Sequence, residues 1–160
     1  MEIRPATVGD APGILALNLE SEWALSPLDR ARLDALLDAA QVALVAEDRD
    51  AVAGFALALA PGAAYDSANF RWFDQRFDSF LYLDRIAIAG THRRRGVGAA
   101  IYEAMEEHAR RAGRMCCEVN LEPRNDASLA FHAARGYGEV GTLEHPGGKR
   151  VVLLVKELAG

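Results

Sequence analysis

The most constraining feature of the sequence is a strand that leads through a short basic turn directly into a long helix. Residues 80–89 are mostly apolar, as expected of a buried strand, and residues 97–112 carry apolar side chains at helical spacing. Gly113 follows as a typical helix end. The turn between them, residues 90–96, contains three consecutive arginines. A chain with this feature must mix strands and helices, and it places the start of a helix at the end of a strand.

The turn has the layout of an anion-binding site. A helix start exposes backbone N–H groups that have no intrahelical partner, and it carries a partial positive charge. The small residues Gly96, Gly98 and Ala99 let a phosphate approach the backbone closely, and residues 93–95 add positive charge. The same residues also fit an ordinary solvated loop, so their spacing alone leaves both interpretations open.

Two other nucleotide-binding motifs do not fit the sequence. A Walker A loop ends in Gly-Lys-Ser or Gly-Lys-Thr, and no such string occurs in the chain. A dinucleotide-binding fingerprint that starts at Gly96 requires a small residue at position 101, which is Ile101. We therefore expect neither an NTPase nor a dinucleotide-binding fold.

The rest of the chain predicts one unit of strands and helices in the order βααβββαβαββ. Asp10 is the expected N-cap of the first helix and Ser26 that of the second, where Pro27 and Asp29 complete the capping pattern. No repeat or linker divides the sequence, so we expect one domain over residues 1–160. The expected strands lie near residues 2–5, 42–46, 52–60, 80–89 and 115–121 and on either side of 146–148, and the helices start near residues 10, 26, 97 and 125.

The composition argues against several classes of partner. The chain is 51% hydrophobic and 26% charged, which suits a globular interior, and its net charge of −5 argues against a surface built for nucleic acid. The longest mostly apolar stretch, residues 51–60, is too short to cross a bilayer, and residues 1–5 carry no targeting signal. We therefore expect no membrane contact and a cytoplasmic location. The adjacent Cys116 and Cys117 and the scattered histidines lack metal-ligand spacing, so we expect no metal.

Two segments of the sequence resemble one known family. Arg93-x-x-Gly96-x-Gly98-Ala99 after an apolar strand resembles the coenzyme A pyrophosphate motif of the GNAT-type N-acetyltransferase superfamily, and the segment from Asn125 to Tyr137 is similar to the part of the family that follows. The resemblance covers the element order from Ile3 to Lys156 and is specific between Leu81 and Tyr137. It implies a single-domain α/β (α+β) fold with a mixed, mostly antiparallel central sheet of about seven strands, a splayed central pair of strands and about four helices.

The resemblance also implies a site for acetyl-CoA as co-substrate. The free backbone groups of Ile86, Ala87 and Ile88 would pair with the pantetheine arm, as a sheet edge accepts a peptide. Asn125 and Ser128 would reach the arm, and Phe131 would lie near the thioester, although a helix cap explains Asn125 equally well. The pyrophosphate would lie against Arg93, Arg94, Arg95, Gly96, Val97, Gly98 and Ala99.

Acetyl transfer requires a neutral amine, so the family carries a base, for which the sequence offers two candidates. Asp84 stands at the position of the glutamate that many members carry, and strand alternation with Leu83 turns it toward the cleft. An ion pair with Arg85 would explain it as well. Glu118 is the second candidate, because it shares a strand face with Asn120 at the border of the same cleft, although it could simply neutralise a nearby arginine.

His132 stands where the family usually has a tyrosine that protonates the departing thiolate. Histidine can donate a proton near neutral pH, so the role can survive the exchange, but a helix residue satisfied by hydrogen bonds is an equal interpretation. Tyr82 and Tyr137 are further candidates for this donor. The missing tyrosine also leaves room for an alternative function, that of a non-catalytic acyl-CoA-binding module.

Residues 65–80 hold six of the 12 aromatic side chains of the chain. Either this segment borders the acceptor site, where the aromatics with Asp66 or Asp74 bind a cationic amine, or it forms a satellite core or a dimer interface. The expected function is transfer of acetyl from acetyl-CoA to a primary amine of a small-molecule or peptide acceptor, which the sequence does not identify. The resemblance also allows a homodimer.

Overall fold

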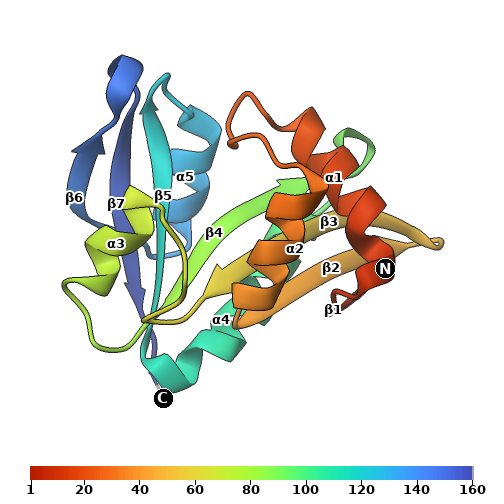
Figure 1. Cartoon of the computed structure of the whole chain (residues 1–160), viewed down its shortest axis with the longest axis horizontal. Coiled ribbons are helices and arrows are strands. Elements are labelled where there is room, and N and C mark those ends of the chain that lie inside the picture. Colours follow the sequence, from red (N-terminus) through yellow and green to blue (C-terminus); the bar gives the residue numbers. More distant parts are fainter. Residues whose placement is uncertain (160) are drawn as a thin grey trace.

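Seven strands form one sheet in the order β1-β2-β3-β4-β5-β7-β6 (Figure 1). The computed structural model describes residues 1–159. Within them all neighbouring strands are antiparallel except β4 and β5, which are parallel. The strands are β1 (Glu2–Pro5), β2 (Val42–Asp48), β3 (Ala51–Leu59), β4 (Leu81–Ile88), β5 (Arg114–Glu122), β6 (Gly138–Glu144) and β7 (Arg150–Glu157).

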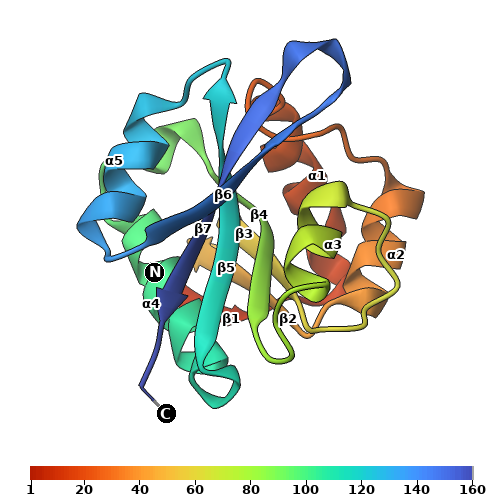
Figure 2. The same ribbon diagram turned by 90° about the vertical axis from the view of Figure 1, so that its left-hand side faces the viewer.

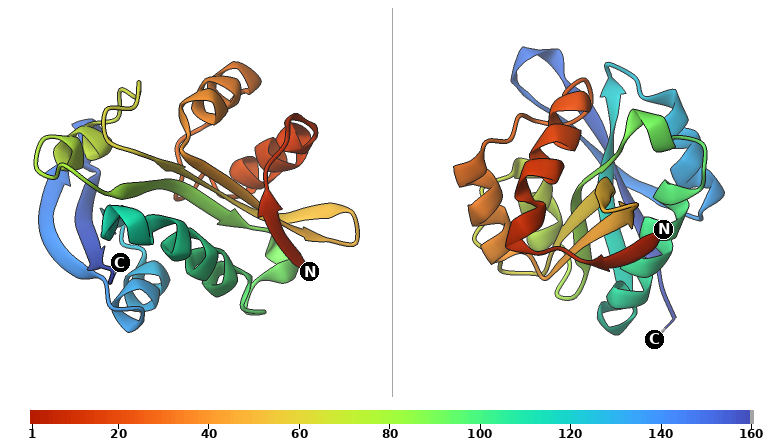
Figure 3. Two further views of the ribbon diagram at one scale, coloured as in Figure 1. Left: turned by 90° about the horizontal axis from the view of Figure 1, so that it is seen from below. Right: turned by 90° about the vertical axis from the view of Figure 1, so that its right-hand side faces the viewer.

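Helices cover both faces of this sheet. Three of them, α1 (Ala11–Glu20), α2 (Arg30–Ala39) and α3 (Ala68–Asp74), lie on one face, and α4 (Val97–Ala109) and α5 (Asp126–Ala134) lie on the other (Figure 3). The mostly antiparallel sheet and the single domain expected from the sequence are confirmed. No helix among residues 1–159 is long and apolar enough to cross a membrane.

The central strands β4 and β5 separate soon after they start. They pair only at Leu81 with Met115 and at Tyr82 with Cys116, and their arrowheads point apart in Figure 1. The expected splayed pair is therefore present. The twist of the sheet then carries β6 and β7 across β5 (Figure 2).

A β-bulge at Asp84 changes which side chains of β4 face each layer. Arg85 pairs with Leu57 and Leu83 with Ala58, so Asp84 is an extra residue on β4. Before the bulge, Leu83 packs in the core beside α4, whereas after it the even-numbered Ile86 and Ile88 pack there. Both Asp84 and Arg85 therefore turn toward the face covered by α1, α2 and α3.

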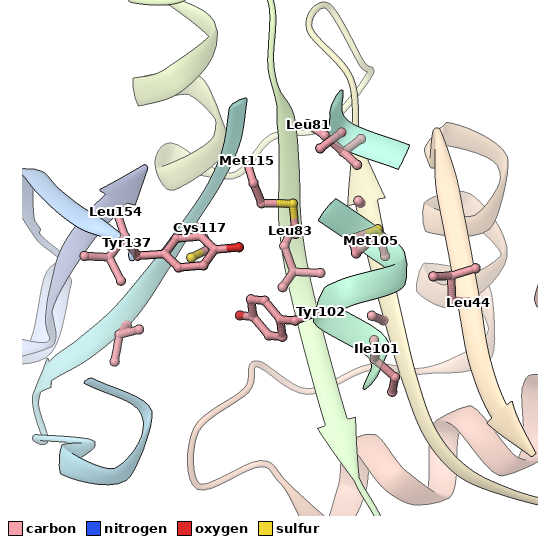
Figure 4. Packing of buried hydrophobic residues seen from close by; sticks show 14 of the residues in the cluster. Leu44, Leu81, Leu83, Ile101, Tyr102, Met105, Met115, Cys117, Tyr137 and Leu154 are labelled. Atoms are coloured by element: carbon pink, nitrogen blue, oxygen red, sulfur yellow. The ribbon is translucent and has the colours of Figure 1, made fainter. Parts of the chain in front are cut away.

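The layer between α4 and the sheet is the largest apolar core (Figure 4). The apolar face of α4, foreseen from its helical spacing, supplies Ile101, Tyr102 and Met105, each of which is buried. They pack against Leu44, Leu81, Leu83, Met115, Cys117, Tyr137 and Leu154. Burial of this face fixes the position of the start of α4 relative to the end of β4.

Two helix starts differ from the sequence-based expectation. The N-cap of α2 is Asp29, whose Oδ1 accepts from the Arg32 amide at 2.7 Å, so the assignment of this cap to Ser26 was wrong. The hydroxyl and carbonyl of Ser26 instead accept from Arg85. Helix α3 was not foreseen, and it makes five α-helices where about four were expected. Its N-cap Ser67 accepts from the Phe70 amide at 3.3 Å.

The aromatic segment folds as a satellite core. The rings of Phe70, Phe73 and Phe80 are fully buried against Tyr82 and β7. Two acidic residues considered for an amine are engaged elsewhere, because Asp66 pairs with Arg32 at 3.0 Å and Asp74 accepts from the Gly62 amide at 3.0 Å. The segment therefore forms a separate apolar cluster beside β4, on the face of the sheet that lies opposite α4.

Glu106 is a buried carboxylate that ties α4 to the last third of the chain. It accepts from Tyr137 at 2.7 Å, Arg135 at 2.8 Å and Lys156 at 3.0 Å. Burial alone would raise the pKa of Glu106, but the three donors outweigh it, and its pKa lies below the usual value. This carboxylate thus joins α4, the end of α5 and β7.

We expect Glu106→Ala to lower the free energy of unfolding by about 2 to 3 kcal/mol, because it leaves the hydroxyl of buried Tyr137 without its acceptor and removes the ion pairs of the partly exposed Arg135 and Lys156. The matched control is Glu107→Ala on the same helix, where an exposed ion pair with Arg110 is worth at most about 1 kcal/mol. Urea unfolding of both variants measures the difference. Equal losses in the two variants would contradict a structural role for this cluster.

Candidate functional site

The separation of β4 from β5 leaves one edge of β4 without a neighbouring strand. The pairing ends at Tyr82, whereas β4 continues to Ile88 while bonded to β3 on its other side. Ile86 and Ile88 face α4, and Ala87 faces α1 and α2. Residues 86–88 therefore have no strand neighbour on the side of the gap, which is the side where the family resemblance places an extended ligand.

The basic turn brings the start of α4 against the end of β4, where Gly98 lies beside Ile88. Arg94 and Gly96 have positive φ angles of 62° and 79°, which turn the chain sharply from β4 into the helix. The first intrahelical bond joins the Ala100 amide to the Gly96 carbonyl at 3.0 Å. The N–H groups of Val97, Gly98 and Ala99 consequently lie ahead of the intrahelical hydrogen bonds and point out of the helix start.

The surroundings of this helix start are open and positively charged. A Cβ atom added at Gly98 would find its nearest neighbour, the Cγ1 of Ile88, only at 4.0 Å. Arg93, Arg94 and Arg95 are exposed, and within residues 1–159 none of them has an ion-pair partner. Open space, outward N–H groups and unpaired guanidinium groups together fit a phosphate group.

The α5 residues lie on the α4 side of the gap. Asn125 caps α5, with its Oδ1 accepting from the Ser128 amide at 3.2 Å, so the capping interpretation of Asn125 has a structural basis. Phe131 is half-buried, with its ring 5.1 Å from that of Tyr102. These side chains therefore border the same layer as the start of α4.

His132 has both ring nitrogens engaged. It is 5% exposed, Nδ1 lies 2.7 Å from the Ser128 carbonyl, and Nε2 is hydrogen-bonded to the hydroxyl of Tyr102. A carbonyl can only accept, so Nδ1 carries the proton and Nε2 of the neutral ring accepts from Tyr102. Burial lowers the pKa of His132, which favours that neutral ring.

On the other face, Asp84 lies in a tight polar cluster. Its side chain is 5% exposed and accepts from the hydroxyl of Tyr65 at 2.6 Å and from Nε of Arg85 at 2.9 Å. Arg85 also donates to Asn18 and Ser26, each at 3.0 Å. The ion pair left open in the sequence is thus present, and it anchors the segment between α1 and α2.

Glu118 lies across the gap on β5, on the same face as Asp84. It accepts from the hydroxyl of Tyr82, which is 2.8 Å from each carboxylate oxygen, and from Nδ2 of Asn69 at 3.0 Å. No arginine pairs with it within the described chain. Burial, and next the negative charge of Asp84, raise the pKa of Glu118 to about 7 against the lowering effect of its two donors. A carboxyl group of this kind can exchange a proton near neutral pH.

Sequence reasoning missed two residues of this cluster, Asn69 and His145. Nε2 of His145 lies 2.9 Å from Oδ1 of Asn69, so the loop between β6 and β7 reaches α3 beside Glu118. The side chain of Asn120, which shares a face with Glu118, donates to the Ala24 carbonyl at 3.3 Å. No spacing in the sequence relates Asn69 to His145, because only the tertiary fold brings α3 and this loop together.

Comparison with known proteins gives a consistent result. A model of the acetyltransferase (GNAT) family matches residues 13–137. The chain is 30% identical over 157 residues to an L-methionine sulfoximine/L-methionine sulfone acetyltransferase of Pseudomonas paraeruginosa, covering 92% of this chain and 86% of that protein.

Solved structures show the same fold at lower identity. A ribosomal-protein-alanine N-acetyltransferase from Brucella melitensis aligns over 99% of this chain and 100% of its own, with a TM-score of 0.76 and 24% identity. Ard1 from Thermoplasma volcanium aligns over 99% of this chain and 98% of its own, with a TM-score of 0.79 and 16% identity.

The raised pKa of Glu118 predicts a pH-dependent cost to stability. The folded state favours the neutral carboxyl of Glu118. Its stabilising contribution to the free energy of unfolding is therefore fully present below about pH 4.5 and is lost as the pH rises through about 7. Relative to Glu118→Gln, the wild type should therefore lose about 2 to 4 kcal/mol of unfolding free energy across this interval. Urea unfolding at several pH values measures it, with exposed Glu139→Gln as control. A constant difference between wild type and Glu118→Gln would contradict the raised pKa.

Proposed function

The chain belongs to the GNAT acetyltransferase family, and we propose that it transfers the acetyl group of acetyl-CoA directly to the primary amine of a small molecule or peptide. One observation supports this most strongly: a carboxyl group with a pKa of about 7, that of Glu118, lies beside the gap where β4 and β5 separate. The phosphate-compatible start of α4 lies at the end of the same β4 strand. A cofactor cradle and a titratable carboxylate thus border the two faces of one opening.

Acetyl-CoA supplies an activated acetyl thioester, and we assign its binding to three groups of residues. The N–H groups at the start of α4 and the side chains of residues 93–95 hold the pyrophosphate. The backbone of residues 86–88 pairs with the amides of the pantetheine arm, which adds to β4 as a strand would. Asn125, Ser128 and Phe131 line the arm from the α5 side.

We propose Glu118 as the general base. An alkyl amine with a pKa near 10 is neutral in on the order of one molecule in 10³ at pH 7, so a base must remove its proton before attack. Glu118 accepts one proton from the ammonium group, and the neutral nitrogen forms a bond to the acetyl carbon. The carbon–sulfur bond then breaks with its electron pair on sulfur, and the second proton that the nitrogen loses on becoming an amide goes to the departing thiolate. Asp84 acts on Glu118 through its negative charge, which raises the pKa of Glu118, while the ion pair with Arg85 and the bond from Tyr65 keep Asp84 itself ionised and in place.

We propose that His132 contributes by holding the hydroxyl of Tyr102 rather than by giving up a proton of its own. Its neutral ring has no proton on Nε2 to donate, because that nitrogen accepts from Tyr102. A thiolate with a pKa of about 8.5 is a stable leaving group near neutral pH and does not depend on a strong acid.

Histidine at this position also supports the second candidate, a non-catalytic acyl-CoA-binding module. The two functions differ in one measurable property. A binding module retains acetyl-CoA affinity but acetylates no amine, whereas the transferase acetylates at least one. The amine panel should include L-methionine sulfone, the type of acceptor named for the 30% identical relative, and peptides with N-terminal alanine, as named for the structural neighbour.

Acetyl-CoA binding tests the proposed cradle. We expect calorimetry to show binding to the wild type and a loss of at least about 100-fold in affinity for Gly98→Trp, whose ring fills the space at the start of α4. Glu103→Trp places the same ring on the exposed face of α4 and should bind as the wild type does. Absence of binding by the folded wild type would refute the proposed function.

The pH dependence of transfer tests the base. We expect kcat/KM of the wild type to rise with pH through about 7 as Glu118 ionises, and kcat of Glu118→Gln to fall by about 10² to 10⁴-fold. Asp84→Asn should move the acidic limb to lower pH, because the negative charge that raises the pKa of Glu118 is gone. His132→Phe should keep the position of this limb. Full activity of Glu118→Gln with unchanged acetyl-CoA binding would exclude Glu118 as the base.

A further inference from the structure

We infer that Asn69 and His145 are positioning residues that hold Glu118 with one carboxylate oxygen directed at the acceptor amine. The inference rests on the proposed function of Glu118. Nε2 of His145 lies 2.9 Å from Oδ1 of Asn69, and Nδ2 of Asn69 lies 3.0 Å from Oε1 of Glu118. A chain of two hydrogen bonds thus leads from the β6–β7 loop through α3 to the carboxylate on β5.

Hydrogen-bond chemistry determines which group donates and which accepts in each of these two hydrogen bonds. An ionised carboxylate only accepts, so the amide of Asn69 must turn its NH₂ group toward Glu118 and its oxygen toward His145. The amide oxygen also only accepts, and Nε2 of His145 must therefore carry a proton. A donor at position 145 consequently prevents the amide from turning over and presenting its oxygen to the negative charge.

The same bonds distinguish the two oxygens of Glu118. Oε1 accepts from both Asn69 and Tyr82, whereas Oε2 has only the hydroxyl of Tyr82, which it shares with Oε1. A carboxylate oxygen has two lone pairs, so Oε2 keeps one for a further donor. We assign to this oxygen, Oε2, the acceptance of a proton from an incoming ammonium group.

The fold holds Asn69 and His145, the two residues of this series of hydrogen bonds, in fixed positions relative to each other. A Cβ atom at Gly141 on β6 would lie only 2.8 Å from Cζ2 of Trp72 on α3, so only glycine permits this contact. Phe70 and Phe73 of α3 are buried in one cluster with residues of β7. At the end of the hairpin, the His145 amide donates to the Lys149 carbonyl at 2.7 Å. Both α3 and the loop of His145 are thereby fixed beside Glu118.

Other charged and titratable groups also face Glu118 and must be kept constant in any test. From β4 these are Tyr82, which donates to the carboxylate, and Asp84, whose charge opposes ionisation. From the β6–β7 loop, the positive charge of Lys149 favours ionisation. Variants at positions 69 and 145 leave all three in place.

The experiment follows the carboxyl group of Glu118 itself. The ¹³C NMR titration of side-chain carboxyl groups, assigned with Glu118→Gln, measures its pKa in the ligand-free protein and needs no substrate. Asn69→Leu removes the donor at similar volume, and we expect it to raise the pKa of Glu118 by about one unit, the effect of one hydrogen bond to a charged group. His145→Phe should raise it less, and His145→Gln, which keeps a side-chain N–H, should restore the wild-type value.

In each variant, the acidic limb of the pH profile of kcat/KM should move to higher pH by the same amount as the NMR pKa of Glu118 rises. Acetyl-CoA affinity should stay unchanged. His108→Phe, at an exposed position on α4, is the control for loss of an imidazole. The inference would be overturned if Glu118 had the same pKa in Asn69→Leu as in the wild type. It would also be overturned if the pKa of Glu118 were the same in His145→Gln as in His145→Phe. Inactivity of the wild type towards every amine would refute the proposed function alone, because the NMR titration still reports on the positioning.

Discussion

The early separation of β4 from β5 is the constraint on which the rest of the structure depends. Two parallel strands that pair at only two positions leave backbone groups unpaired in the middle of a sheet, where such groups are costly unless a ligand or water satisfies them. The sheet remains stable because each half is completed separately, by β1 to β3 on one side and by β7 and β6 on the other. Helix α4 packs against both sides of the opening, with Leu83 of β4 and Cys117 of β5 in one core. The opening is therefore built into a rigid frame.

The two faces of this opening have different chemistry. Exposed arginines and outward N–H groups dominate the α4 side, whereas the side of α1 to α3 carries carboxylates held by tyrosine and asparagine. A phosphate-bearing ligand and a cationic amine would be attracted to opposite faces. They could then meet only through the gap between the strands. Under the proposed function, this separation of charge would orient both substrates before any side chain takes part in bond formation.

Local sequence rules predicted much of the fold. Apolar periodicity located β4 and α4, and the glycine and arginine spacing identified the turn between them. The failures have physical causes. Ser26 has the composition of a helix cap, but Arg85 takes its hydroxyl, and Asp29 caps the helix instead. Helix α3 has only seven residues, and its two buried rings, Phe70 and Phe73, are too short a pattern to distinguish a helix from an aromatic loop. The contact between Asn69 and His145 spans 76 positions and leaves no local pattern.

The bulge at Asp84 makes the number of residues in β4 as important as their identity. Side chains of a strand alternate between its two faces, and the extra residue shifts that alternation by one for everything downstream. Removal of either Asp84 or Arg85 would leave one residue between Leu83 and Ile86, and the ladder could close regularly with Leu83 opposite Ala58 and Ile86 opposite Ala56, as now. Ile86 and Ile88 would then keep their places in the core beside α4. What the extra residue provides is a place for two neighbouring residues of one strand on the same face of the sheet, which regular alternation does not allow.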